Sequence, residues 1–403
     1  MAEPVSPRQR LLCFADDWGR HPSSAQHLVR HLLPRWDVTW FNTIGTRRPT
    51  LTAADLRRAL QRLRVGARAA KPGAASCAPH IVAPFMYPGF RTRWQRALNA
   101  AVLQRAVARA VGRPSPQPSP KGRGSEATVA VTTLPITADV VGRVAGVTRW
   151  VYYCVDDFSV WPGLDGGVMD AMERRLVQRV DALVCVSETL RERMKQLGRD
   201  DAALLTHGVD LEQWDASLQA SDDDAPEAPH VHAGLRPSAP PRALFWGLID
   251  ERLDHDFVRH LARAGVAVTL LGPGADVSIT GVAREPAVPH ADLPARAAAA
   301  DVLVMPYVDA PVTRAMQPLK LLEYLATMRP VVVRDLPATG PWADCCDVAA
   351  TAEEFARTCV ARAAAGTPPE QLAARRRRLP AEAWSEKARC FERILRGQPI
   401  STA

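Results

Sequence analysis

The sequence predicts an α/β protein with two parallel-sheet domains that face each other across a cleft. Three observations lead to this prediction: the chain has 403 residues, short apolar segments alternate with amphipathic ones in both halves, and a stretch without either pattern separates the halves. Alternating strands and helices need crossover connections, so the strands should run parallel with helices on both faces of each sheet. A chain with 47% hydrophobic and 23% charged residues is a folded globular protein, which excludes disordered and coiled-coil classes.

The first half supplies the first predicted domain, residues 1–214. Its apolar segments predict strands at 10–15, 37–41, 80–85, 128–134, 149–155 and 181–187. The amphipathic segments between them predict helices at 27–33, 53–63, 93–111, 136–144, 168–180 and 188–197. Residues 114–125 hold four prolines and no apolar residue, so we expect a disordered surface insertion there.

The second half repeats the pattern after an acidic and then proline-rich segment, 215–241, which we interpret as the interdomain linker. Strands are predicted at 242–247, 266–272, 301–307 and 330–335, with helices at 254–264, 292–300 and 318–327. These belong to a second domain, 242–380, and a final helical segment occupies 381–403. Ligands of open α/β sheets bind at the carboxyl ends of the strands, so the site should lie there.

Charge is distributed unevenly. The net charge is +8, but residues 56–125 contain fourteen lysines and arginines and no acidic residue. Such a face attracts an anionic partner: a lipid headgroup, a phosphorylated acceptor or nucleic acid.

The basic segment 90–113 is helical, with Trp94, Leu98, Val102, Leu103 and Val107 at helical spacing. We expect its apolar face to pack into the first domain and its arginines to remain free to meet an anionic membrane surface. Nucleic acid is not expected, because stacking aromatics are not interleaved with the charges.

Compartment and metal content follow from what the sequence lacks. No apolar stretch approaches the roughly 20 residues that span a bilayer, and the apolar run before Asp16 is shorter than the core of a signal peptide. We therefore expect a cytoplasmic protein, peripheral on the inner face of the membrane if it binds lipid. The eight cysteines have no metal-ligand spacing, so reduced thiols and no metal are expected.

The most informative segment runs from residue 313 to 333. Lys320 and Glu323 are three residues apart on a predicted helix that opens near Pro318, between two predicted strands. A lysine at a helix start suits a phosphate group, and a carboxylate one turn later can accept the two hydroxyls of a ribose. An exposed ion pair would produce the same spacing.

Two loops of the second domain carry further candidates. Gly247 follows a predicted strand and would let the backbone approach a ligand closely, while Arg252 could supply a positive charge there. The charged residues around Arg252 could equally form a solvated turn, with Glu251 and Asp254 at the surface or behind the residues that contact the ligand. Gly272 and Gly274 suit either a nucleotide-base loop or a plain turn.

The first domain offers two groups of candidates for ligand binding in the cleft. Gly19, with Ser23 and Ser24, could cap a helix and offer N–H groups, and Arg20 and His21 could line the cleft. Asp156 and Asp157 close a predicted strand next to Trp161. Carboxylates beside aromatic rings can hold a sugar, and one could act as a general base, although a turn-capping role explains the same residues.

At this point the sequence resembles a known family. The segment QPLKLLEYLATMRPVV is similar to the nucleotide-sugar signature of family-4-type GT-B glycosyltransferases, and FWGLIDERLD, VCVSETLRERM and THGVDLEQW resemble companion segments. With YYCVDDFSVWPGL, they look closest to the teichuronic-acid and cell-envelope polysaccharide branch. The resemblance spans most of residues 11–395. It implies two Rossmann-like domains, sugar transfer from a nucleotide-diphosphate sugar, and a last helix that crosses back to the first domain.

Carried over by position, Glu323 resembles the ribose-binding glutamate and Lys320 the residue near the diphosphate. Arg252 lies where related enzymes place a basic residue against the donor diphosphate, and it could offset the charge that grows on the departing group. Where many members have a second glutamate this chain has Ala315, for which Thr313, Arg314 and the backbone at Met316 could substitute, and Met328 replaces a usual glycine at the helix end. The resemblance thus implies a glycosyltransferase, with retention of configuration, that acts on a lipid-linked or polysaccharide acceptor without a cofactor. The alternatives are a sugar-nucleotide epimerase on the same fold and a non-catalytic anionic-surface binding protein with a degraded donor site.

Overall fold

The computed structural model describes residues 9–19, 23–42, 78–112, 127–214, 240–275 and 277–399. The chain forms two compact units, one of residues 1–205 with 388–403 and one of residues 206–387. The expected helix at 53–63, the insertion at 114–125 and nearly all of the linker at 215–241 lie outside the described residues. Within the described residues, no helix has the length and apolar character needed to cross a membrane.

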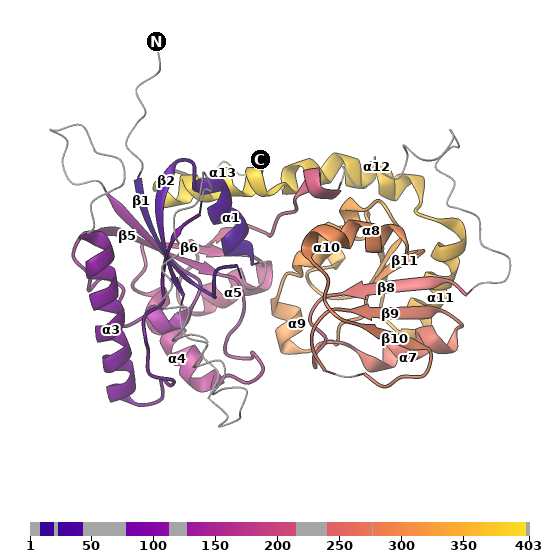
Figure 1. Ribbon diagram of the computed structural model, residues 1–403, viewed down its shortest axis with the longest axis horizontal. Helices are drawn as coiled ribbons and strands as arrows, with labels where there is room; N and C mark the ends of the chain where they lie inside the picture. The colour runs from indigo at the N-terminus through magenta and orange to yellow at the C-terminus, as the bar shows by residue number, and fades with distance from the viewer. Residues whose placement is uncertain are drawn as a thin grey trace, which may run out of the picture. The chain divides into compact units, whose positions relative to one another are not determined.

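The first unit is built on a seven-stranded sheet of the described residues. Its order is β3-β2-β1-β4-β5-β6-β7, and every pairing is parallel. The strands are β1 (Gln9–Ala15), β2 (Trp36–Asn42), β3 (His80–Val82), β4 (Thr128–Thr132), β5 (Val147–Cys154), β6 (Ala182–Cys185) and β7 (Ala203–Leu204). The helices are α1 (Ser24–Leu32), α3 (Arg93–Val111), α4 (Gly166–Val177) and α5 (Glu188–Gln196), with a 3-10 turn η1 (Pro135–Thr137). Figure 1 shows α3 along one flank of this sheet.

The second unit repeats the architecture with six strands. The order is β10-β9-β8-β11-β12-β13, again all parallel. The strands are β8 (Arg242–Trp246), β9 (Ala267–Leu271), β10 (Val282–Glu285), β11 (Val302–Met305), β12 (Val331–Arg334) and β13 (Asp347–Ala349). The helices are α7 (His255–Arg263), α8 (Leu293–Ala298), α9 (Pro311–Ala315), α10 (Leu319–Ala326), α11 (Ala352–Ala365) and α12 (Pro369–Arg378), with 3-10 turns η2 (His290–Asp292), η3 (Gly340–Trp342) and η4 (Leu379–Glu382).

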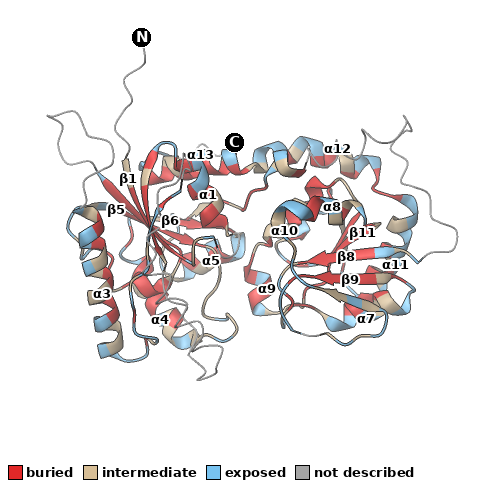
Figure 2. Ribbon diagram, viewed as in Figure 1, coloured by how far each residue is buried: buried red, intermediate tan, exposed pale blue. Residues whose placement is uncertain are grey.

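Each sheet is the core of its unit. The central strands β1, β4 and β11 are buried along most or all of their length. Figure 2 shows the strands of both sheets mostly in the colour of buried residues. Continuous apolar runs without polar alternation are typical of parallel strands covered on both faces. The expectation of two parallel-sheet α/β units is therefore confirmed.

The chain returns to the first unit through its last helix, α13 (Trp384–Leu395), of which residues 388 onward belong to that unit. There Phe391 packs on Tyr153 with ring centroids 5.3 Å apart. The Glu392 carboxylate accepts hydrogen bonds from Trp36 Nε1 at 3.0 Å and from Arg35 Nη2 at 2.7 Å. At the other boundary the structure places residues 206–214 in the second unit rather than the first, because Val209 bridges Ala383 and Trp214 stacks on Trp246 at 5.7 Å.

One local prediction is wrong, and another is correct only in part. Residues 136–144 form the short turn η1 and further turns instead of a helix. In α3 the predicted apolar face is correct in part: Leu103 and Val107 are fully buried, but Trp94 and Leu98 are 55% and 46% exposed, and Asn99, Ala100 and Ala110 complete the buried stripe. Asn99 belongs to that stripe because its amide bonds the backbone of Tyr87 in both directions, at 2.7 and 3.0 Å.

Candidate functional site

The second sheet has a topological switch point between β8 and β11. From β8 the chain proceeds to β9 and β10 on one side, and from β11 to β12 and β13 on the other. Connections leave the sheet in opposite directions there, which opens a crevice outside the carboxyl ends of the two strands. The Lys320 ammonium lies at this point, 4.3 Å from the ring centroid of Phe245 on β8 and 5.1 Å from that of Tyr307, which follows β11.

Lys320 is a half-buried cation to which the described part of the chain offers no acidic partner. Among the described residues, its ammonium makes contacts with the two aromatic faces but no hydrogen bond or ion pair. Ring faces attract a cation, yet they leave its three N–H donors unused. The alternative interpretation of Lys320 and Glu323 as an exposed ion pair on a solvated helix does not hold, because Glu323 bonds other residues.

Both oxygens of Glu323 are held in place. Oε2 accepts a hydrogen bond from Trp246 Nε1 at 3.1 Å, and Oε1 lies 2.7 Å from His290 Nε2. His290 Nδ1 lies 3.1 Å from the Gln213 side-chain amide nitrogen, so the ring fits the tautomer that donates from Nε2 to the carboxylate. The Glu323 side chain is 17% exposed, and each oxygen retains a further acceptor position for a ligand hydroxyl.

His290 and Gln213 are site residues that sequence reasoning missed. His290 opens η2, beyond the short strand β10, which was also not predicted. The pairing of Trp214 with Trp246 brings Gln213 to the same place. Tyr324, next to Glu323, is fully buried and supports Trp246 through its hydroxyl, which accepts a 3.1 Å hydrogen bond from the Trp246 N–H. Burial raises the pKa of Tyr324, which keeps the phenol neutral.

The three predicted glycines allow close packing at the carboxyl edge, for two different reasons. Beyond the strands, the loops after β8 and β9 continue to pair through Ile249 and Gly274. A Cβ on Gly272 would lie 2.1 Å from the carbonyl oxygen of Gly247, and one on Gly274 would lie 1.9 Å from that of Ile249. Both have positive φ, so only glycine lets these loops lie against each other. Gly247, also at positive φ, makes room for Lys320.

The two predicted arginines of this unit are already paired. Arg252 makes a bidentate ion pair with Asp250, at 3.0 Å from Nε and 2.9 Å from Nη2, and its side chain is only 12% exposed. Arg314 bonds Asp309 at 3.0 Å and is 54% exposed. Asp254, expected at the surface or behind the residues that contact the ligand, is half-buried, caps α7 and pairs with Arg334.

Thr313 takes a different role from the one predicted. It is fully buried, and its hydroxyl donates to the Val308 carbonyl at 2.5 Å while accepting from the Ala310 N–H at 3.0 Å. It therefore fixes the start of α9 and cannot reach a ligand with its side chain. Ala315 and Met316 are buried at the end of that helix, where the Met316 N–H bonds the Val312 carbonyl. Met328, with φ of 57°, is the one non-glycine of the described residues in the left-handed region, at the position where the family resemblance implies glycine.

In the first unit the predicted loop after β1 also lies at a switch point, between β1 and β4. Gly19 has positive φ and donates its N–H to Gln26 Oε1 at 3.0 Å. Ser23 stands at the start of α1, but its hydroxyl bonds Asp16 instead of capping the helix. Arg20 and His21 lie outside the described residues.

The two predicted aspartates after β5 lie in different surroundings. Asp157 accepts hydrogen bonds from the N–H and hydroxyl of Ser159 at 2.9 and 2.5 Å, the geometry of a capped turn, and lies 3.6 Å from Arg193 Nη1. Asp156 and Trp161 are half-buried in the same loop.

Sequence reasoning missed Glu173, a buried carboxylate bonded to Tyr152 at 2.7 Å and to Arg193 at 2.8 Å. Among the described residues, no group of three or more acidic, histidine or cysteine side chains could hold a metal.

Comparison with known proteins begins at the sequence level. No protein-family model matches the chain. TuaH of Bacillus subtilis strain 168, whose name assigns it to teichuronic acid biosynthesis as a glycosyltransferase, is 31% identical over 187 residues. This alignment covers 43% of the chain and 45% of TuaH, so the chain matches less than half the length of this relative.

Solved structures match over nearly the whole chain. HepE of Anabaena, in complex with UDP-glucose, has a TM-score of 0.63 at 11% identity and covers 97% of this chain and 100% of its own. The α,α-trehalose-6-phosphate synthase of Burkholderia multivorans has a TM-score of 0.60 at 13% identity, covering 97% and 98%. The chain has a GT-B fold. This GT-B fold confirms the architecture that the sequence resemblance implied, and identities this low show the fold alone.

Proposed function

We propose that this chain is a glycosyltransferase that takes its sugar from a nucleotide-diphosphate donor. The donor would bind at the carboxyl edge of the second sheet, with Lys320 against the diphosphate and Glu323 accepting the ribose hydroxyls. The observation that carries the proposal is Lys320: a half-buried ammonium without an acidic partner among the described residues, at the switch point of a parallel sheet and one helical turn from a positioned carboxylate.

The chemistry of transfer explains why such a cation belongs there. When the bond between sugar and diphosphate breaks, negative charge grows on the departing diphosphate oxygens. A lysine that is already desolvated against two rings stabilises that charge without reorganisation, so it contributes to the rate as well as to binding. Arg252 and Arg314 are paired with Asp250 and Asp309, so each would have to exchange its carboxylate for the diphosphate to contribute.

The comparisons support this proposal and favour UDP as the first nucleotide to test. TuaH is named a glycosyltransferase, and the HepE structure contains UDP-glucose. We further propose a lipid-linked or polysaccharide acceptor in cell-envelope glycan synthesis, retention of configuration, and no cofactor. Asp156, Asp157, Gly19 and Trp161 remain the predicted acceptor-side residues, with Asp157 already engaged by Ser159.

We also propose that the first unit docks on an anionic membrane through one exposed face. We call it the α3 face; it consists of Ile81, Phe85, Tyr87, Trp94 and Leu98, with Arg93, Arg105 and Arg109. Phe85 is 82% exposed, and Tyr87 packs edge-on against Trp94 at 4.9 Å. The described residues 80–112 contain no acidic side chain. Aromatic side chains beside arginines are typical of surfaces that bind the headgroup region of anionic bilayers.

Donor binding can be tested with nucleoside diphosphates. The melting temperature of the protein is measured with UDP, GDP, ADP and TDP; we expect one diphosphate to raise it. Lys320→Met and Glu323→Gln should each abolish the rise, whereas Glu370→Gln, an exposed carboxylate in the same unit, should retain it. Release of the same diphosphate from a matching sugar donor then tests transfer. If none of the four diphosphates changes the melting temperature, the donor site is refuted and the non-catalytic binding protein remains.

A further inference from the structure

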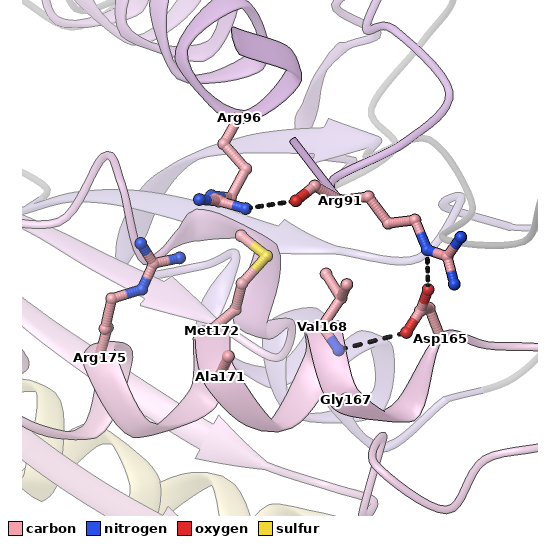
Figure 3. Close-up of a pocket in the computed structure, with 8 residues that line it drawn as sticks. All are labelled: Arg91, Arg96, Asp165, Gly167, Val168, Ala171, Met172 and Arg175. Carbon is pink, nitrogen blue, oxygen red and sulfur yellow. Dashed lines mark hydrogen bonds and ion pairs between the residues drawn. The ribbon is translucent and has the colours of Figure 1, made fainter. Parts of the chain in front are cut away.

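The charged side chains that line the cavity between α3 and α4, of about 460 Å³, are already paired. Figure 3 shows Arg91 bonded to Asp165, the N-cap of α4, while Arg175 lies ten residues farther along that helix. There Arg175 pairs with Asp139 at 3.3 Å. The guanidinium groups therefore do not converge on one ligand. A polar network that does converge on a ligand site lies in the second unit.

The chain enters the second unit through residues 206–214, which we call the entry segment. Its backbone pairs with the segment that follows α12. The Val209 N–H donates to the Glu382 carbonyl at 2.9 Å, and the Val209 carbonyl accepts from the Trp384 N–H at 3.1 Å. A Cβ on Gly208 would lie 2.8 Å from the Trp384 ring, so only glycine allows this close approach. The entry segment is therefore a packed part of the second unit.

Gln213 connects the entry segment to Glu323 through one intermediate residue. Its amide nitrogen donates to the His290 carbonyl at 3.0 Å and lies 3.1 Å from His290 Nδ1. A carbonyl only accepts hydrogen bonds, so the Gln213 atom between the carbonyl and the ring is the NH2 group, which only donates. His290 Nδ1 therefore accepts, and Nε2 carries the ring hydrogen toward Glu323 Oε1, 2.7 Å away. Gln213 thus selects the tautomer of His290 that holds the carboxylate.

The neighbouring residue, Trp214, supports the other oxygen of Glu323. Trp214 is buried and stacks on Trp246, with ring centroids 5.7 Å apart and an interplanar angle of 14°. Trp246 Nε1 in turn donates to Glu323 Oε2 at 3.1 Å. Two adjacent residues of the entry segment thus each support one oxygen of the same carboxylate, and together they hold its plane against rotation.

A carboxylate held in this way recognises a pair of neighbouring hydroxyl groups. Each oxygen of Glu323 accepts one N–H and retains a further acceptor position. The 2′ and 3′ hydroxyls of a ribose are two adjacent donors, one for each oxygen. A carboxylate free to rotate about its last bond would be aligned with both hydroxyls for only part of the time, so fixing its plane increases affinity for the intact ribose.

We propose that Gln213 is a positioning residue that makes the donor site selective for nucleotides with an intact ribose. It acts through His290, whose tautomer it selects, and not by contact with the nucleotide. The entry segment is in this way a working part of the donor site. The inference rests on the proposed function, because it takes Glu323 as the group that accepts the ribose hydroxyls.

Two nucleotides separate positioning from general stability. Dissociation constants of UDP and of 2′,3′-dideoxy-UDP, which lacks both hydroxyls, are measured by calorimetry on the full chain; if the melting-temperature panel selects another base, the corresponding pair is used. The parent chain should prefer the ribonucleotide about tenfold or more, as expected for hydrogen bonds to a charged group. Gln213→Met keeps the length of the side chain but donates no hydrogen bond. It should reduce this preference about threefold or more and leave the affinity for the dideoxy nucleotide unchanged.

A double-mutant cycle tests whether Gln213 acts through the histidine. His290→Phe should also reduce the preference for the ribonucleotide. Adding Gln213→Met to His290→Phe should cause no further reduction, because both changes act on the same oxygen of Glu323. A further reduction of the same size in the double variant would mean that Gln213 acts independently of His290, and would overturn the inference.

Gln317→Met is the matched control. The Gln317 side-chain oxygen accepts from the His207 N–H of the entry segment at 2.6 Å, a bond that involves neither His290 nor Glu323. This variant should keep the parent preference for the ribonucleotide. Equal loss of affinity for both nucleotides in Gln213→Met, or the same change of preference in the two glutamine variants, would show that Gln213 supports only the fold. If no diphosphate binds the parent chain, the proposed function fails, and the inference fails with it.

Discussion

The ammonium of Lys320 lies where a Cβ on residue 247 would be, at 2.1 Å from that ideal position. Gly247 also has φ of 133°, which side chains rarely adopt. The glycine after β8 thus has two functions: it adopts the positive φ that the loop requires, and it leaves space for the lysine over Phe245. An alanine at 247 would displace the very group that we assign to the diphosphate.

The first prediction follows from that displacement. Gly247→Ala should lower the free energy of unfolding by about 1–2 kcal/mol, from the strain of the positive φ, and weaken binding of the preferred nucleoside diphosphate about tenfold or more. Gly265→Ala is the control, because Gly265 has φ of 77° but open space around its Cα. It should lose stability and retain nucleotide affinity. Equal nucleotide affinity in the two variants would show that Lys320 does not contribute to nucleotide binding.

His290 is predicted to act as a positioning residue for Glu323. His290→Phe keeps a ring beside Trp214 but removes the 2.7 Å hydrogen bond, so nucleotide affinity should fall about tenfold. His290→Gln retains a donor and should restore part of the affinity. Calorimetric titration of both variants checks this, and a purely structural role of the ring predicts the opposite order.

The carboxyl-edge site could be predicted from the sequence because parallel strands bring their loops to one edge. The hydrophobic periodicity of the strand before Gly247 and of the helix that carries Lys320 and Glu323 can be recognised in the sequence. The structure brings these three residues together at β8 and β11. His290 could not be found in this way, since it reaches Glu323 from beyond the four-residue strand β10. A strand that short carries too little periodicity to be recognised.

The exposed face of α3 was mispredicted for a related reason. Apolar side chains lie nearly all round this helix, so spacing alone does not show which stripe is buried. The Asn99 amide decides it by bonding the backbone of Tyr87 and Gly89, and that turns Trp94 and Leu98 outward. Similarly, nothing local in the sequence indicates that Arg193 joins Asp157, Asp170 and Glu173.

The outward position of Trp94 leads to a prediction about membranes. Trp94→Ser and Leu98→Ser should each reduce the fraction of protein that sediments with phosphatidylglycerol vesicles several-fold, because each removes apolar area from the α3 face. Both side chains are about half exposed, so the melting temperature should change little. Val360→Ser, which alters an exposed apolar residue of the second unit, is the control. Unchanged vesicle binding in all three variants would refute docking through this face.

A last prediction concerns the buried carboxylate at the Arg193 cluster. Burial raises the pKa of Glu173 above its ordinary value of 4.5, while hydrogen bonds from Tyr152 and Arg193 oppose the rise. Because the folded-state pKa is the higher one, the stability that Glu173 contributes is complete below pH 4.5 and is lost as the pH rises through the folded-state value. The free energy of unfolding of the parent chain, relative to Glu173→Gln, should therefore fall as the pH rises from 4.5 toward 7.

Urea unfolding of both proteins across this range measures that slope. Asp170→Asn is the matched control from the same cluster. Hydrogen bonds from Arg174 and Arg193, together with their charges, lower the pKa of Asp170 below its ordinary value of 3.8 despite partial burial. Its contribution to stability is therefore lost only as the pH falls below that value. The difference in free energy of unfolding between the parent chain and Asp170→Asn should not change from pH 4.5 to 7. If the difference in free energy of unfolding between the parent chain and Glu173→Gln stays constant or rises with pH, then Arg193 keeps the buried carboxylate ionised as readily as in the unfolded chain.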